Sequence, residues 1–431
     1  MSKAKIEIMC RTGNLAMWKR LLPILLYAGL VSVTGCSGIA KELTRHPNSE
    51  FYCMQYNIRY EQITNSTIEK MEPAGSVCEG DVEVYYKRGL EAQADCIAAK
   101  TNILLNDVEE RTGLQIPYKV KVYLIRMERI PENVDACFKI SPSNELYLPL
   151  FVEAGNESCE SIISQNIFYP DYIVHELAET SLAGFQKCRR HVLGDYQLAL
   201  FGRFIQVDIS NYTRWFREGF ASYAGYLAYE TIRPQINSKS AYAKCKTFWS
   251  PFTSLSKVRK KLFSWKNTSA KALDGDYYNA SVGLFLLVRN LFGEQAVREI
   301  ILKINMQDDL NGEDLIKLTN KVLGTDIEEL AEHFSFPRTG LETEGLTAAD
   351  VMNRDLSFTE GLGVIAVEPN SPADKAGIKE YDVILKVDDK PVIISLDFEL
   401  AILDALDRKA VKLTVWKKEN RKIAELQLPI D

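Results

Sequence analysis

The stretch VHELAE at residues 174–179 and the stretch WFREGFA at residues 215–221 carry most of what this sequence indicates about fold and chemistry. Residues four apart on a helix share one face, so His175 and Glu179 could bind one metal ion together. Glu176 lies one position round the same helix, near the metal but not on it. A general base must lie there to take a proton from a metal-activated water. The first stretch therefore predicts a helix with two metal ligands and a base.

The second stretch supplies the candidate for a third ligand. A catalytic metal site has three protein ligands and one open position for water and substrate. Glu218, 43 residues after His175, lies on the second predicted helix and is the natural choice. The expected ion is a single zinc, with His175, Glu179 and Glu218 as its ligands. A solvated role for these glutamates, or ion pairs with Arg214 or Arg217, is the alternative.

The first stretch differs from the zinc-binding pattern H-E-x-x-H because Glu179 stands where the second histidine belongs. Two carboxylate ligands would neutralise most of the charge of the ion. Its water would then be less acidified than with two imidazoles and one carboxylate. Ions that prefer oxygen ligands also become more competitive. His191 is a possible substitute imidazole, although no helical spacing supports it.

The rest of the pattern predicts strands first and a series of helices afterwards. Alternation at residues 118–125 and the run at 145–150 predict strands, and Pro149 suits an edge strand. Residues 81–112 have the apolar stripe of a helix. Further helices are expected at residues 173–182, 212–232, 279–291, 295–304, 312–323 and 326–334. This order favours an α+β domain with a cleft between two lobes.

Beyond about residue 350 the sequence changes to short strands separated by turns, with GLGV, VEPNSPADKAGI and YDVILKVDDKPV in succession. Over about residues 350–429 it closely resembles the PDZ domains of bacterial envelope proteases. Leu362, Gly363 and Val364 are expected to offer backbone N–H groups to a peptide carboxylate, beside a strand edge that accepts a peptide. The expected partner is a protein C-terminus or an unfolded segment. A module that only packs against the preceding domain is the alternative.

The segment NYTRWFREGFASY at residues 211–223 resembles the third-ligand helix of the glycyl aminopeptidase family. These proteins are gluzincins, metallopeptidases with a glutamate as the third zinc ligand. The order of the motifs, the long insert between them and the PDZ domain that follows also match that family. The resemblance implies a thermolysin-like, two-lobed peptidase domain. It further implies that a tyrosine in YYNAS, residues 277–281, hydrogen-bonds the oxyanion of the reaction. Tyr278 fits best when Ser281 is matched to the family's small residue, and Tyr277 is the alternative.

The N-terminus has the features of an export signal. Lys19 and Arg20 precede an apolar run at residues 21–33 that is short for a membrane span. The run leads into VTGC, which resembles the lipobox of bacterial lipoproteins and implies cleavage before Cys36 and lipidation of that cysteine. Ser37 is not the aspartate associated with inner-membrane retention, so the expected location is the outer membrane, facing the periplasm. An ordinary signal anchor is the alternative.

The composition is that of a globular protein behind such an anchor, with 46% apolar and 26% charged residues. The net charge of −6 argues against nucleic-acid binding. Seven cysteines follow Cys36, so an exported chain is expected to form disulfide bonds and to leave at least one cysteine outside them.

The expected domains are a lipoprotein signal peptide over residues 1–36, a tether over 37–80, a gluzincin-like peptidase domain over 81–338 and a PDZ domain over 350–431. The expected activity is hydrolysis of peptide bonds at the cell envelope by a metal-activated water. Glu179 motivates an alternative, a catalytically inactive pseudo-peptidase that binds peptides or proteins as an envelope adaptor. A purely structural envelope role is the third possibility.

Overall fold

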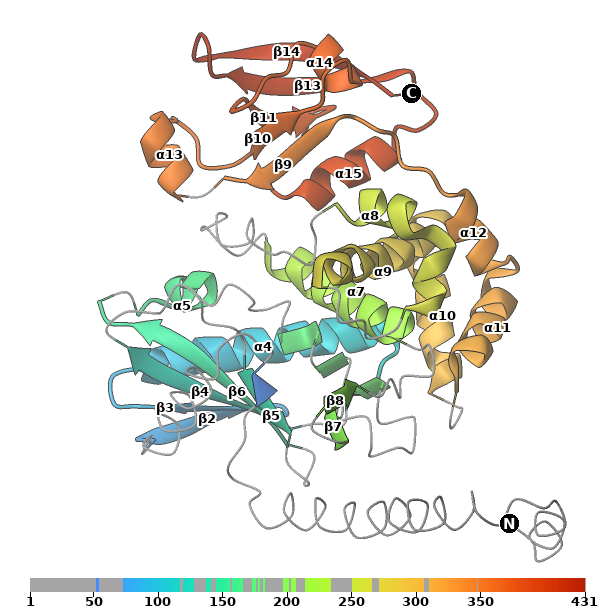
Figure 1. The fold of residues 1–431 in the computed structure, drawn as a ribbon. Helices are drawn as coiled ribbons and strands as arrows, with labels where there is room; N and C mark the ends of the chain where they lie inside the picture. The colour runs from blue at the N-terminus through green and yellow to red at the C-terminus, as the bar shows by residue number, and fades with distance from the viewer. Residues whose placement is uncertain are drawn as a thin grey trace, which may run out of the picture.

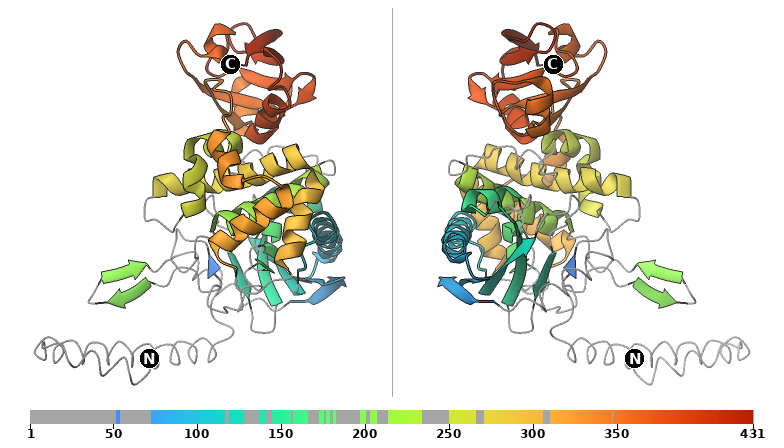
Figure 2. Two further views of the ribbon diagram at one scale, coloured as in Figure 1. Left: turned by 90° about the vertical axis from the view of Figure 1, so that its right-hand side faces the viewer. Right: turned by 90° about the vertical axis from the view of Figure 1, so that its left-hand side faces the viewer.

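The computed structural model describes residues 52–53, 73–116, 119–127, 137–140, 145–155, 157–165, 173–175, 177–178, 181–182, 197–200, 203–206, 214–233, 250–265, 271–305, 310–346 and 348–430. The predicted signal segment with Cys36 lies outside these ranges, as do Glu176, Glu179 and His191. Among the described residues, no helix is long and apolar enough to cross a membrane. The described chain forms a sheet lobe, a helical lobe and a β-rich C-terminal module (Figures 1 and 2).

The sheet lobe consists of six strands in the order β1-β5-β6-β4-β3-β2, with the long helix α4 (Glu91–Thr112) packed on them (Figure 1). The strands are β1 (Tyr52–Cys53), β2 (Gly75–Glu79), β3 (Val82–Tyr86), β4 (Lys119–Met127), β5 (Cys137–Ile140) and β6 (Glu145–Glu153). Strands β3, β4 and β6 run parallel, and the other pairs are antiparallel. Alternate residues such as Val84 and Val122 are buried in one core with Ile97 of α4, as expected for strands with one covered face.

The beginning of this lobe differs from the sequence prediction. Residues 82–86, predicted as the start of a helix, form strand β3, which pairs with β2 on one side and β4 on the other. The predicted tether 37–80 ends in strand β2, and the tight turn between β2 and β3 contains Gly80 at φ +57°. The folded part of the chain therefore begins before residue 81. Short strands such as these are stabilised by their neighbours in the sheet, which a local pattern does not reveal.

The strands predicted at residues 118–125 and 145–150 correspond to β4 and β6. The edge position predicted for the second strand is wrong, because β6 lies between β5 and β4. Pro149 is tolerated there because the β5–β6 ladder covers residues 146 and 147 and the proline lies beyond it.

The second lobe is built from helices, in agreement with the predicted order. Within the predicted helix 173–182, each described residue is helical. The helices are α5 (Cys159–Gln165) beside the sheet, α7 (Arg214–Ile232), α8 (Pro251–Val258), the 3₁₀ helix η4 (Arg259–Ser264), α9 (Lys271–Phe292), α10 (Glu294–Ile304), α11 (Gly312–Leu323) and α12 (Ile327–His333). A small hairpin of β7 (Gln197–Leu200) and β8 (Arg203–Gln206) extends to one side (Figure 2). The mixed α+β architecture is thus confirmed.

Helix α7 lies in the centre of the helical lobe. Trp215, Phe216 and Phe220 are each at most 2% exposed, so these aromatic residues are core residues. The neighbouring helices α8 and α9 approach each other very closely. A Cβ atom on Gly283 of α9 would lie 2.4 Å from the carbonyl oxygen of Pro251, so only glycine permits this contact.

The C-terminal module is a sheet in the order β14-β13-β11-β10-β9, with β12 paired to β11. Its elements are β9 (Leu341–Gly345), α13 (Ala348–Arg354), β10 (Leu362–Val367), α14 (Pro372–Lys375), β11 (Val383–Val387), β12 (Lys390–Pro391), α15 (Ser395–Leu403), β13 (Ala410–Lys417) and β14 (Lys422–Pro429). Strand β9 pairs with β10 along its whole length. The module therefore begins before residue 350, the boundary that the sequence predicted.

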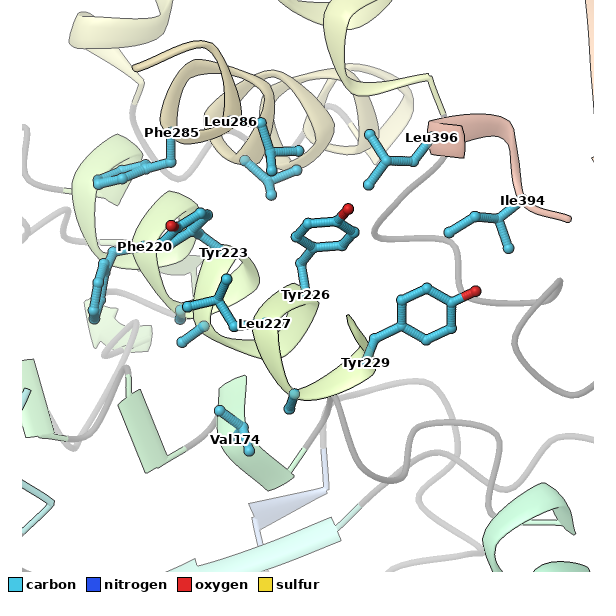
Figure 3. Close-up of a cluster of buried hydrophobic side chains, with 14 of the residues drawn as sticks. Val174, Phe220, Tyr223, Tyr226, Leu227, Tyr229, Phe285, Leu286, Ile394 and Leu396 are labelled. Carbon is cyan, nitrogen blue, oxygen red and sulfur yellow. The ribbon is translucent and has the colours of Figure 1, made fainter. Parts of the chain in front are cut away.

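Helix α15 of this module is fixed to the helical lobe. Glu399, only 3% exposed, accepts hydrogen bonds from the backbone N–H of Phe252 at 2.7 Å and of Thr253 at 3.2 Å, at the first turn of α8. Arg233, just beyond the end of α7, donates to Asp397 at 2.8 Å. Figure 3 shows Ile394 and Leu396 next to Tyr226 and Tyr229 of α7. Buried polar and apolar contacts together hold the module against the lobe.

Two of the cysteines form a disulfide bond between α4 and α5, Cys96 with Cys159. Cys78 on β2 is a free, exposed thiol, in keeping with the odd number of cysteines. Cys53 and Cys137 lie directly opposite each other in the β1–β5 register.

Replacing both Cys96 and Cys159 with serine is expected to lower the free energy of unfolding by about 4 kcal/mol. The reason is that the bond joins residues 63 positions apart and so restricts the unfolded chain. Urea unfolding monitored by circular dichroism would measure the loss. Cys78→Ser is the matched control and should leave the midpoint unchanged, because this thiol is exposed and free. A double variant as stable as the control would contradict the prediction.

Candidate metal centre

The structure brings His175 and Glu218 together from two different helices. His175 Nε2 lies 3.6 Å from Glu218 Oε2, and the two side chains are 13% and 5% exposed. Two ligands of a tetrahedral zinc ion, each about 2.1 Å from the metal, are separated by about 3.4 Å. The separation of these two atoms therefore suits a shared zinc ion.

Ser222 orients the imidazole of His175. It lies one helical turn after Glu218 on α7, and its hydroxyl is 3.3 Å from His175 Nδ1. A hydrogen bond at Nδ1 leaves Nε2 directed toward Glu218. Histidine ligands of metals are commonly held in this way through the second ring nitrogen. Helix α7 thus provides both a candidate ligand and the group that orients the other one.

The two carboxylate oxygens of Glu218 have different surroundings. Oε1 accepts a hydrogen bond from the Tyr278 hydroxyl at 3.2 Å and lies 3.5 Å from Arg214 Nε. Oε2 is buried and has no hydrogen-bond partner among the described residues. A buried carboxylate oxygen without a partner is costly. Glu218 Oε2 and His175 Nε2 lie side by side, and a carboxylate oxygen and an imidazole nitrogen are both common zinc ligands.

Glu218 and Tyr278 meet because helices α7 and α9 are in close contact at Gly219. A Cβ atom on this glycine would lie 2.8 Å from the carbonyl oxygen of Ser281. Ser281 in turn donates a hydrogen bond to the carbonyl of Tyr278 at 2.7 Å. Of the two candidate tyrosines, Tyr278 contacts Glu218, whereas the ring of Tyr277 stacks on Trp265 at 5.6 Å.

The electrostatic surroundings keep Glu218 ionised. Burial by itself raises the pKa of this carboxyl, but the contact with His175 and the positive charges of His175, Arg214 and Arg217 outweigh burial and lower the pKa below its usual value. A deprotonated carboxylate is the form that binds a cation.

Two of the three predicted ligands can be placed. Glu179 and the proposed base Glu176 lie outside the described residues. Within the described ranges, no cluster of three or more His, Cys, Asp or Glu side chains could hold a metal ion. Arg214 is a residue of this site to which the sequence assigned no role beyond a possible ion pair. Its spacing of four residues from Glu218 was the available signal.

The predicted peptide-binding residues of the C-terminal module are not at an open edge. Leu362 and Gly363 on β10 pair with β9 on one side and β11 on the other. The N–H of Val364 donates to Asp382, and its carbonyl accepts from Tyr381. This part of the prediction is wrong, because an interior strand has no free backbone groups for an added strand. The edge strand on this side of the sheet is β9.

Comparison with known proteins identifies the C-terminal module. The PDZ domain family matches residues 335–428, a range that includes every strand from β9 to β13 and nearly all of β14. Residues 335–428 therefore form a PDZ domain, which confirms the predicted fold of this module and moves its start toward the N-terminus.

Two curated relatives match part of the chain. "Putative protease Do-like 14" of Arabidopsis thaliana is 34% identical over 110 residues, covering 22% of this chain and 26% of the relative. "Probable periplasmic serine endoprotease DegP-like" of Rickettsia conorii is 32% identical over 114 residues, covering 26% of this chain and 18% of the relative. The chain thus spans about a quarter or less of the length of these relatives.

Solved structures show weak overall similarity. An aminopeptidase N family protein from Idiomarina loihiensis is 14% identical, with a TM-score of 0.41, over 83% of this chain and 66% of that chain. The HtrA3 PDZ domain bound to a phage-derived ligand (FGRWV) is 23% identical, with a TM-score of 0.20, over 22% of this chain and 85% of that chain.

Proposed function

We propose that this protein is a metal-dependent peptidase of the bacterial cell envelope. The observation that supports this most strongly is the 3.6 Å approach of His175 Nε2 to the buried Oε2 of Glu218, an oxygen that has no hydrogen-bond partner within the described part of the chain. His175 and Glu218 would hold a zinc ion, with Glu179 as the third ligand from the helix that carries His175. A bound zinc ion would polarise a carbonyl and make a water more acidic.

The protein groups around the site have separate tasks in this proposal. Glu176 takes a proton from the attacking water and later delivers it to the leaving amine. Tyr278, whose hydroxyl donates its one hydrogen to Glu218 Oε1 in this structure, would turn that hydrogen to the oxyanion of the tetrahedral intermediate. Ser222 and Arg214 hold the two ligands in place.

The proposed cellular setting is an inference from the N-terminal sequence. The curated relatives have protease names, although they are matched over a minor part of their length. Lipidation of Cys36 would anchor the protein in the outer membrane, and two or more acyl chains would make the attachment stable. The PDZ domain would bind a peptide segment or a protein C-terminus, and the edge strand β9 is where an added strand could pair.

A second candidate function is peptide binding without cleavage, in an envelope adaptor. One observation favours it: Arg214 lies within 3.5 Å of Glu218 Oε1, so the glutamate has a cationic partner within the protein. The glutamate at position 179 also favours peptide binding without cleavage, because it replaces the second imidazole of the common motif.

A peptide library incubated with residues 37–431 and zinc tests the proposed activity. We expect cleavage that a chelator abolishes and added zinc restores. Glu176→Gln should bind zinc normally and cleave at least about 100-fold more slowly, because general base catalysis contributes that much or more. A library left intact by the wild-type protein, together with cleavage by Glu179→His, would instead support the pseudo-peptidase.

A further inference from the structure

Arg214 has an unusual position for a charged side chain. It is the first described residue of α7, one turn before Glu218, and it is only 9% exposed. Its Nη2 donates a hydrogen bond of 2.7 Å to the Tyr278 hydroxyl, and its Nε lies 3.5 Å from Glu218 Oε1. The planar guanidinium therefore reaches two different groups of the candidate metal centre at once.

Aromatic rings fix the orientation of this guanidinium. Its central carbon lies 4.3 Å from the centre of the Trp265 ring and 5.2 Å from that of the Tyr278 ring. Trp265 is 2% exposed and packs edge-on against Tyr278 at 4.9 Å. Stacking on aromatic faces suits arginine better than lysine, because the guanidinium is planar and weakly hydrated. The arrangement is a rigid support and not a solvent-exposed ion pair.

We propose that Arg214 is a positioning residue of the metal centre, which directs a single oxygen of Glu218 toward His175. This inference rests on the metal site proposed above. Arg214 and Tyr278 both contact Oε1, so that oxygen is held away from the metal position and Oε2 alone faces His175 Nε2. Glu218 would then act as a ligand through one oxygen, in a fixed orientation.

The positive charge of Arg214 has a second consequence for this site. With Glu179 in place of a histidine, the proposed ligands include two carboxylates and one imidazole. A guanidinium beside Glu218 offsets part of the additional negative charge. It does so without occupying a ligand position, because it lies against Oε1 and not against Oε2. Arg214 thereby brings the ligand set closer in charge to one with two imidazoles and one carboxylate.

Competition with a coloured chelator would measure the zinc dissociation constant of wild-type residues 37–431 and of Arg214→Gln, Arg214→Lys and Tyr278→Phe. Loss of a group that orients a metal ligand weakens affinity by about 10- to 100-fold. We expect Arg214→Gln and Arg214→Lys both to fall in this range, since lysine keeps the charge but loses the fork geometry. Arg289→Gln is the matched control: it removes a part-buried arginine paired with Glu230 and should leave affinity unchanged.

A second readout reports on the orientation of Glu218. In the cobalt-substituted protein, release of Oε1 would let both carboxylate oxygens bind, and a higher coordination number weakens the visible absorption. We expect weaker bands in Arg214→Gln and Arg214→Lys and unchanged bands in Arg289→Gln. The double variant Arg214→Gln with Tyr278→Phe should lose less affinity than the two single losses combined, because both residues act on one oxygen.

The outcomes distinguish this inference from the proposed function. If the wild-type protein binds no zinc, the metal site and the role of Arg214 both fail. If the wild-type protein binds zinc and the Arg214 variants bind it equally well or more tightly, the metal site stands and the positioning role is overturned. If Arg214→Gln does not fold, as judged by circular dichroism, the affinity of Arg214→Lys decides the question.

Discussion

Replacing Glu218 with glutamine is expected to lower the zinc affinity of the protein by more than about 100-fold, the upper end for a group that only orients a ligand. Glutamine has nearly the same shape and can still contact Tyr278, but its neutral amide is a far weaker ligand than a carboxylate. Metal content after dialysis, measured by mass spectrometry on residues 37–431, is the direct test. We expect about one zinc per wild-type chain, as in single-ion hydrolase sites.

Glu230→Gln is the matched control for this experiment. Glu230 lies on the same helix and is ion-paired with Arg111 and Arg289. It should keep its zinc. Equal zinc content in Glu218→Gln and Glu230→Gln would place the metal elsewhere. Absence of zinc from the wild-type protein, even after zinc is supplied, would leave peptide binding as the function to pursue.

The stability of the protein is expected to fall as the pH rises from about 5 to 7, because of Glu399. Burial raises the pKa of this carboxyl to about 7, although the hydrogen bonds from Thr253 and Phe252 act in the opposite direction. Its ordinary value is 4.5, so between these two values the folded protein binds more protons than the unfolded chain. Stability is then highest below pH 4.5 as far as this group is concerned, and decreases as pH rises through the folded pKa.

The shift sets an upper limit of about 3 kcal/mol for the decrease. Urea midpoints of the wild-type protein and Glu399→Gln at a series of pH values would isolate the contribution of Glu399, since other titrating groups cancel in the difference. Glu399→Gln should lack this decrease. Asp404→Asn, at the exposed end of the same helix, should behave like the wild-type protein. Parallel pH profiles for the wild-type protein and Glu399→Gln would show that Glu399 is already ionised in the interface.

The long helices were predictable because their apolar residues recur with the period of the helix. Helix α7 was predicted as residues 212–232, and its described part spans Arg214–Ile232. The PDZ domain was predictable because about residues 350–429 closely resemble the PDZ domains of bacterial envelope proteases. Strands β3 and β9 were missed, because a five-residue strand at the margin of a domain is stabilised by its partner strands and not by its own sequence.

The sequence by itself determined the α+β order of elements, because that order depends on local patterns of apolar residues. His175 and Glu218 were candidates from the types and positions of their motif residues, whereas the PDZ domain and Tyr278 were predicted from resemblances to known families. Only the tertiary structure decided how these residues meet. Gly219 permits the helix contact that brings Tyr278 to Glu218, and Arg214 is directed to both by the ring of Trp265. Such contacts join residues far apart in the chain, and packing sets their distances.

The PDZ domain shows the same distinction between what the sequence predicts and what the fold decides. A resemblance to known PDZ domains identified the module, but the pairing of its strands determined that β10 is interior and β9 is the edge. Its attachment to the helical lobe depends on Glu399, whose carboxylate reaches the first turn of a helix about 150 residues earlier. The sequence determines which chemical groups the chain carries. The fold determines which of these groups become neighbours, and therefore which are buried and which form hydrogen bonds.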